Sequence, residues 1–331
     1  MPIVFALLAI IGLIIFANWL VVLNRADFNR WFDWFLLVLS ASFLALGLVV
    51  IAAPPEILAG FSTSDVVRLQ NPLATGVLLL STAVWGMVVS FQTGRAFLAR
   101  WLPINPKSPV HGLALVLSGA LAGSTLLTLT QGGLEGVAET AVPTPLFDFV
   151  LQQSFFVLLA VLGVGLAVRR RVPDLWSRLG LERPSRAQLK FGLRWIAILL
   201  AIQWTVGVAW ALAAPAQSEL LGGISDVLVG NFDTLGEWFV VALGAGIGEE
   251  ILFRGALQPI FGLWFTSILF AVAHIQYGIT PITILVFVIS LALGYIRRRS
   301  NTAVAIFVHA GYDFVLGLLY LLAVYLQPFA G

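Results

Sequence analysis

Long apolar runs, separated by short polar segments, follow one another along this chain. The first run continues to Leu23 with no basic residue ahead of it and no clear small-residue cleavage site, so we expect a first transmembrane helix rather than a cleaved signal peptide. Nine further runs can cross a hydrocarbon core of about 30 Å: they lie near 32–53, 73–93, 110–130, 146–168, 193–214, 235–258, 260–276, 279–296 and 302–327. The pattern predicts an all-α fold, a polytopic transmembrane helix bundle of about ten helices.

The composition agrees with a membrane environment. Of 331 residues, 60% are hydrophobic and 10% are charged, whereas about 25% of the residues of a soluble domain are charged. The chain has no cysteine, which excludes disulfides, thiolate metal sites and cysteine nucleophiles. A metal site would therefore need histidines and carboxylates.

The basic residues indicate orientation rather than a nucleic-acid partner. Because Lys and Arg are enriched in cytoplasmic loops, their distribution reports topology. In the ten-helix count, 16 of the 18 basic residues fall in alternate loops on one side, and the loops of the other side contain Arg68 alone. We therefore expect the basic loops to be cytoplasmic, both termini to lie on the opposite side, and no nucleic acid to bind.

One long polar segment, 169–190, divides the chain. We predict that it is a cytoplasmic basic linker between an N-terminal five-helix membrane module, 1–168, and a catalytic membrane domain, 191–331, whose core motifs lie in 240–316. The role of the first module is not indicated by any motif, and binding of a membrane-protein partner is one possibility for it. No internal repeat is visible, which disfavours a transporter built from repeats.

Ionisable residues within three of the apolar runs are the candidates for function. Each such residue costs at least about 2.5–3.5 kcal/mol at the centre of a membrane helix. The candidates are Glu249, Glu250 and Arg254 in one run, His274 in the next, and His309 and Asp313 in the last. A site built from several helices would explain why they are retained.

Helical spacing separates the two adjacent glutamates. Neighbouring residues on a helix point about 100° apart, and residues four apart face each other. Glu250 is therefore expected to pair with Arg254, whereas Glu249 points elsewhere and has no local cation, as suits a general base. His309 and Asp313 also share one helix face.

By their estimated depth in the membrane, these residues lie at a similar level. At about 1.5 Å per residue from the cytoplasmic helix ends, Glu249 lies roughly 15 Å deep, His274 roughly 21 Å, and His309 roughly 13 Å, with Asp313 roughly 20 Å. All are near the middle of the membrane. They could build one hydrated site for water-activated hydrolysis.

Three motifs occur here in order. They read Glu249-Glu250-x-x-x-Arg254, then Phe270-x-x-x-His274, then His309-x-x-x-Asp313. This set resembles the CAAX-protease and bacteriocin-processing (CPBP or Abi) family of intramembrane proteases, which includes the type II CAAX prenyl endopeptidases. The resemblance covers under a third of the chain.

The resemblance implies a role for each residue. Glu249 would be the general base that activates water, and His274 would help to hold that water. His309 with Asp313 would stabilise the tetrahedral oxyanion. Glu250 and Arg254 would form a supporting ion pair.

Two points stay open at this stage. The eukaryotic prenyl proteases of the family have Asn at the position of Asp313, so Asp313 is either protonated, or orients His309, or ligates a metal. The chain lacks the His-Glu-x-x-His helix that favours zinc. We expect no required cofactor; a divalent metal such as zinc, if present, would be held by Glu249, His274, His309 and Asp313.

The main hypothesis is therefore an intramembrane endopeptidase acting on a peptide or membrane-protein substrate in contact with membrane lipids. Two alternatives are a non-catalytic membrane scaffold or assembly partner, and a proton- or cation-coupled transporter that uses the buried acids. The motifs do not indicate whether the substrate is prenylated.

Overall fold

The computed structural model describes residues 2–54, 57–58, 71–130 and 132–326, and these residues form helices and no strand. The all-α prediction is confirmed. Contacts divide the chain into two compact units. Unit 1 comprises Met1–Thr140 and Ile268–Thr283, and unit 2 comprises Ala141–Ser267 and Ile284–Gly331.

Nine helical segments of the described chain are long and apolar enough to cross a membrane. They are Val4–Leu23, Ala26–Ala52, Pro72–Ser90, Pro109–Leu129, Leu146–Gly163, Arg186–Ala213, Leu235–Ala273, Pro281–Arg299 and Thr302–Leu326. The chain is thus an integral, multi-pass membrane protein. The side on which each loop lies stays a prediction, and Arg68 lies outside the described residues.

One of these segments contains two of the expected helices. Leu235–Ala273 covers both 235–258 and 260–276 and has 39 residues, which at 1.5 Å per residue is about 58 Å, far longer than one membrane crossing. Gly262, with φ 76° and ψ 175°, breaks the helical geometry within it. Glycine has no Cβ and adopts this conformation without strain, so the kink divides the segment close to where the sequence predicted a break.

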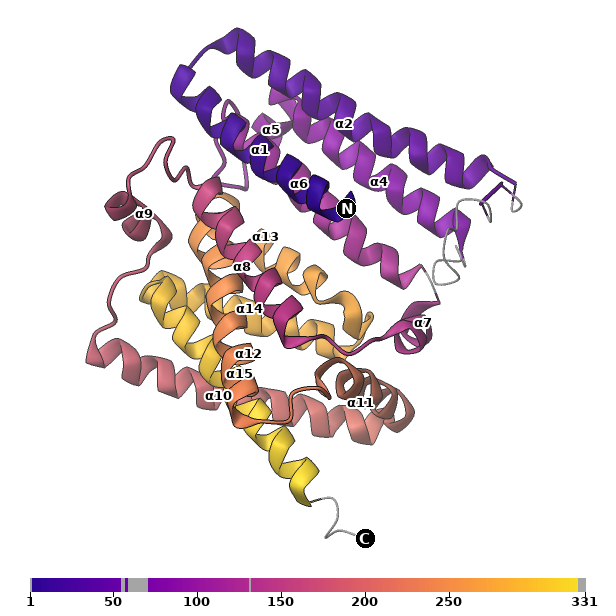
Figure 1. The fold of residues 1–331 in the computed structure, drawn as a ribbon, viewed down its shortest axis with the longest axis vertical. Coiled ribbons are helices and arrows are strands. Elements are labelled where there is room, and N and C mark those ends of the chain that lie inside the picture. Colours follow the sequence, from indigo (N-terminus) through magenta and orange to yellow (C-terminus); the bar gives the residue numbers. More distant parts are fainter. Residues whose placement is uncertain (1, 55–56, 59–70, 131, 327–331) are drawn as a thin grey trace. The chain divides into compact units, whose positions relative to one another are not determined.

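Unit 1 contains the first helices (Figure 1). They are α1 (Pro2–Leu23), α2 (Ala26–Ala52), α4 (Pro72–Ser90), α5 (Gln92–Leu98), α6 (Pro109–Leu129) and α7 (Gly133–Thr140), with the short η2 (Ile275–Tyr277). α2 and α4 lie side by side. A Cβ on Gly76 would stand 2.9 Å from the Gly47 carbonyl oxygen, so the absence of side chains there lets the two backbones meet.

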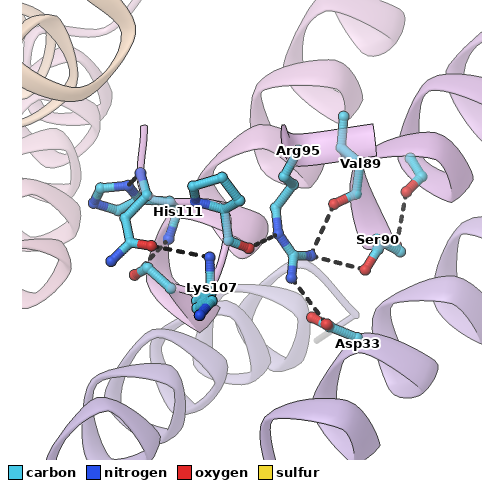
Figure 2. Close-up of polar contacts among 10 residues, drawn as sticks. Asp33, Val89, Ser90, Arg95, Lys107 and His111 are labelled. Atoms are coloured by element: carbon cyan, nitrogen blue, oxygen red, sulfur yellow. Dashed lines mark hydrogen bonds and ion pairs between the residues drawn. The ribbon is translucent and has the colours of Figure 1, made fainter. Parts of the chain in front are cut away.

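A buried arginine joins the helices of unit 1 to the loop before α6. Figure 2 shows the Arg95 guanidinium surrounded by acceptors. It donates to the carbonyl oxygens of Val89, Ser90 and Pro106 and forms a 2.8 Å ion pair with Asp33. Only 1% of Arg95 is exposed. Each of these partners satisfies part of a charge that would otherwise be costly to bury.

Unit 2 contains the remaining helices, apart from the ends of two that pass into unit 1. They are α8 (Leu146–Gly163), α9 (Val172–Leu179), α10 (Arg186–Ala213), α11 (Pro215–Val229), α12 (Leu235–Glu249), η1 (Glu250–Leu257), α13 (Gln258–Ala273), α14 (Pro281–Arg299) and α15 (Thr302–Leu326). α12 packs against α15 on one side and against α8 on another. α8, the last helix of the predicted N-terminal module, is therefore a neighbour of α12 within unit 2. The predicted modules themselves stay a prediction.

Candidate functional site

The site is built where α12 passes into η1, a π-helix. π-helical turns are rare and often occur at functional sites, because the wider turn re-aims side chains. Gly246, four residues before Glu250, brings α15 close: a Cβ there would lie 3.0 Å from the carbonyl oxygen of Ile306. This close approach sets Glu250 on η1 beside His309 on α15.

Glu250 forms two contacts at the centre of the site. Its Oε2 lies 3.2 Å from Nε of Arg254, and its Oε1 lies 3.0 Å from Nδ1 of His309. Glu250 and Arg254 are both 0% exposed. The ion pair expected from the four-residue spacing is therefore present, and Glu250 also makes a contact with another helix that the spacing did not indicate.

His309 lies between two carboxylates. Its Nε2 is 3.4 Å from Oδ2 of Asp313, one helical turn further along α15. The side chain of Asp313 is 24% exposed, so this end of the network is partly accessible from outside the protein. On the opposite end, Nη2 of Arg254 donates to Oγ of Ser290 on α14. Arg254, Glu250, His309 and Asp313 thus form one connected polar network inside unit 2.

Glu249 is the next residue before this network and is 8% exposed. It lies near enough to Arg254 for an electrostatic interaction. It points away from the Glu250 side chain because adjacent helical residues are rotated by about 100°. A carboxylate in this position could accept a proton from a water molecule beside the network.

His274 directly follows α13 and lies in unit 1. Its Nδ1 is 2.8 Å from the carbonyl oxygen of Phe270, and the two rings stack with centroids 4.4 Å apart. Because a carbonyl oxygen only accepts, Nδ1 carries a proton, and a neutral ring then presents Nε2 as an acceptor. These contacts explain the spacing of Phe270 and His274. That His274 shares a site with Glu249 stays a prediction.

A metal at this site stays a prediction. Nδ1 of His309 faces Glu250, an arrangement that also orients metal-ligating histidines, and Nε2 with Asp313 would be the atoms left to hold a metal. Among the described residues, no three His, Asp or Glu side chains are grouped as metal ligands would be.

Two arginines outside the motifs hold the π-helix. Nη1 of Arg178, on α9, donates to the Gly255 carbonyl oxygen at 2.9 Å, and Nε of Arg297, at the end of α14, donates to the Arg254 carbonyl oxygen at 3.1 Å. In the sequence, these arginines indicated only the orientation of the loops that contain them. Their role as donors to backbone carbonyls has no signature in spacing or composition.

α9 also contacts the start of α15. The carbonyl oxygen of Gly180, which follows α9 with φ 69°, accepts a 2.9 Å hydrogen bond from the backbone N–H of Thr302. Leu179 packs on Gly255. The predicted linker therefore contacts both helices that carry the network, η1 and α15. The glycine after an amphipathic stretch was the one visible sign of a fixed helix end.

A further polar residue near the site comes from α8. Gln153 is 5% exposed, and its side chain covers Gly248, where a Cβ would lie 2.2 Å from its Oε1. On α15, the Tyr312 hydroxyl donates to Oε1 of Gln203 on α10 at 2.9 Å. Both glutamines were visible as polar residues in apolar runs, but the runs did not indicate which helices they face.

Comparison with known proteins supports the motifs. Residues 231–315 match a family model described as type II CAAX prenyl endopeptidase Rce1-like. This range contains all three motifs and is well under half of the chain. No significant match was found among curated proteins or among solved structures. The predicted resemblance is confirmed: residues 231–315 are similar to the Rce1-like family of CAAX proteases.

Proposed function

We propose that this chain is an intramembrane endopeptidase that hydrolyses a peptide bond of a membrane-associated protein. The similarity of residues 231–315 supports intramembrane CAAX endopeptidase activity in general. The observation that carries the proposal is the buried network in which Glu250 and Asp313 flank His309, directly beside Glu249. Such a network is too costly in a membrane to be retained without a use.

In the proposed reaction, Glu249 takes a proton from a water molecule as the water oxygen attacks the carbonyl carbon of the scissile peptide bond. The tetrahedral intermediate has a negatively charged oxygen. The C–N bond then breaks, and the leaving amine takes the proton from Glu249. That His274 helps to hold this water is proposed from the motif resemblance alone.

His309 is proposed to stabilise the oxyanion. Glu250 accepts from Nδ1 and so fixes the ring, while the 3.4 Å contact between Nε2 and Asp313 is long for a hydrogen bond. Because this contact is long, an oxyanion that approaches in the plane of the fixed ring could take the place of the Asp313 carboxylate as the acceptor of an N–H at Nε2. In this proposal Glu250 positions His309 as well as neutralising Arg254.

The test uses the full chain in lipid vesicles with two matched reporter proteins, one prenylated at its C-terminus and one not. Because general acid–base catalysis contributes about 10²–10⁴-fold, we expect Glu249→Gln to lower the cleavage rate by at least about 100-fold. The control is Glu219→Gln, an exposed glutamate of α11, which should cleave as the wild type does.

Cleavage that survives in Glu249→Gln would refute the proposal. If neither reporter is cut by the wild type, and ion flux through the vesicles depends on Glu249, the chain is a transporter. If the Glu249→Gln protein fully complements a deletion strain, the scaffold alternative holds.

A further inference from the structure

A tight loop after α8 presents two arginines together. The backbone N–H groups of Arg169 and Arg170 both donate to the Gly165 carbonyl oxygen at 2.9 Å, and Ala167 has a positive φ of 63°. The side chains of both arginines donate to the carbonyl oxygen of Val164. The loop therefore holds two guanidinium groups around one backbone oxygen.

Two more guanidinium groups lie at the adjoining end of η1. Arg178 and Arg297 donate to the consecutive carbonyl oxygens of Gly255 and Arg254. Val164 and Ala256 belong to one hydrophobic cluster, so the two pairs of arginines are neighbours. We call Arg169, Arg170, Arg178 and Arg297 the arginine cluster.

The charges of the cluster act on one another. Burial lowers the pKa of Arg178 to about 10, and repulsion from Arg170, Arg297 and Arg169 adds to this. All four side chains are half-buried. In the described part of the chain, no carboxylate forms an ion pair with Arg170, Arg178 or Arg297. Arg170, Arg178 and Arg297 donate to backbone carbonyls, whose partial charge compensates only part of the positive charge of these three residues.

We propose that the arginine cluster binds the phosphate of an anionic lipid headgroup. Each guanidinium has five N–H donors. Arg170 and Arg297 each use one donor, and Arg178 uses two, in the hydrogen bonds to backbone carbonyl oxygens. The remaining donors match the oxygens of a phosphate, which arginine binds in a forked geometry.

The position of the cluster identifies the source of the phosphate. Arg169 and Arg170 follow the end of the membrane segment Leu146–Gly163, and Arg297 lies in the last turn of Pro281–Arg299. Ends of membrane segments lie at the level of the headgroups, where anionic lipids attract basic residues. A bound headgroup would hold α8, α9, η1 and α14 together at the end of the helix that carries Glu250.

The test compares two double variants that remove the same charge. Arg170→Gln with Arg297→Gln changes two members of the cluster, whereas Arg171→Gln with Arg298→Gln changes their exposed sequence neighbours. Each full-length protein is placed in nanodiscs of phosphatidylcholine with or without phosphatidylglycerol. Native mass spectrometry counts the retained anionic lipid, and the unfolding temperature is measured in both compositions.

We expect the wild-type protein and the Arg171→Gln/Arg298→Gln variant to retain phosphatidylglycerol and to unfold at a higher temperature in its presence. The Arg170→Gln/Arg297→Gln variant should bind phosphatidylglycerol at least about tenfold more weakly, because two charge-assisted contacts are lost. Since the readout is the difference between two lipid compositions, a general loss of stability cancels. Proteolytic activity is not measured, so the result is independent of the proposed function.

An equal loss of bound phosphatidylglycerol in the two double variants would overturn the proposal, since bulk charge alone would then explain binding. An equal rise in unfolding temperature on adding inorganic phosphate to phosphatidylcholine nanodiscs would also overturn it, in favour of a free anion. If the glutamine pair does not fold, Arg170→Lys with Arg297→Lys replaces it. The two lysines keep the positive charge but lack the forked guanidinium geometry. Weaker selectivity for phosphatidylglycerol over phosphatidylcholine then supports the site, and unchanged selectivity overturns it.

Discussion

At the scale of residues, two adjacent glutamates have different surroundings. Glu250 is fully buried between Arg254 and His309, whereas Glu249 keeps some exposure. Helical spacing alone predicted the pairing of Glu250 with Arg254, because residues four apart face each other. The contact with His309 joins residues 59 apart in sequence, and no local pattern could indicate it.

This difference predicts unequal effects on stability. Removing one partner of a buried ion pair leaves an uncompensated charge, so we expect Glu250→Gln to lower the free energy of unfolding by about 3–5 kcal/mol. Glu249→Gln should change it by no more than about 1 kcal/mol. Thermal unfolding in detergent, followed by tryptophan fluorescence, measures both. Equal destabilisation by the two changes would contradict the assignment of Glu250 as the neutralising partner of Arg254.

At the scale of elements, α9 is the connection between the predicted linker and the network. It donates to η1 through Arg178 and is bonded to the start of α15 through Gly180. Periodicity could predict a short amphipathic helix here. Its partners come from distant parts of the sequence, so only the folded chain determines that this surface helix contacts both site helices.

A cross-link tests this contact. A Cβ on Gly255 would lie 3.6 Å from Cβ of Leu179, within the roughly 3.5–4.5 Å range of disulfides. Because the chain has no cysteine, Leu179→Cys with Gly255→Cys should form one disulfide on oxidation, found as a linked peptide by mass spectrometry. Ser177→Cys, on the exposed side of α9, is the control partner for Gly255→Cys. Cross-linking of the control pair alone would contradict the observed packing of α9.

At the scale of the whole molecule, the chain is a multi-pass membrane protein whose described residues contain nine candidate spans. Hydropathy predicted the spans because burial in lipid is a local requirement on composition. The kinked segment Leu235–Ala273 shows the limit of this reasoning. Two predicted spans are one helical run interrupted at Gly262.

The expected orientation can be tested by labelling single cysteines in the otherwise cysteine-free chain. Because basic loops stay in the cytoplasm, Arg171→Cys and Arg298→Cys should react with a membrane-impermeant maleimide only when the cytoplasmic face is accessible. Glu219→Cys in α11 should react only from the opposite face. Labelling of all three sites from one face would refute the predicted topology.

The sequence alone was sufficient to predict the all-α membrane fold, the approximate spans, the three motifs and the pairing of Glu250 with Arg254. Each of these depends on hydropathy or on spacing within one helix, which are local properties. The folded chain was needed to show that Glu250 contacts His309 and that four acceptors surround the buried Arg95. It was also needed to show that Arg178 and Arg297 donate to carbonyl oxygens of the π-helix. These contacts join distant segments, and they form because packing brings together polar groups that the lipid cannot satisfy.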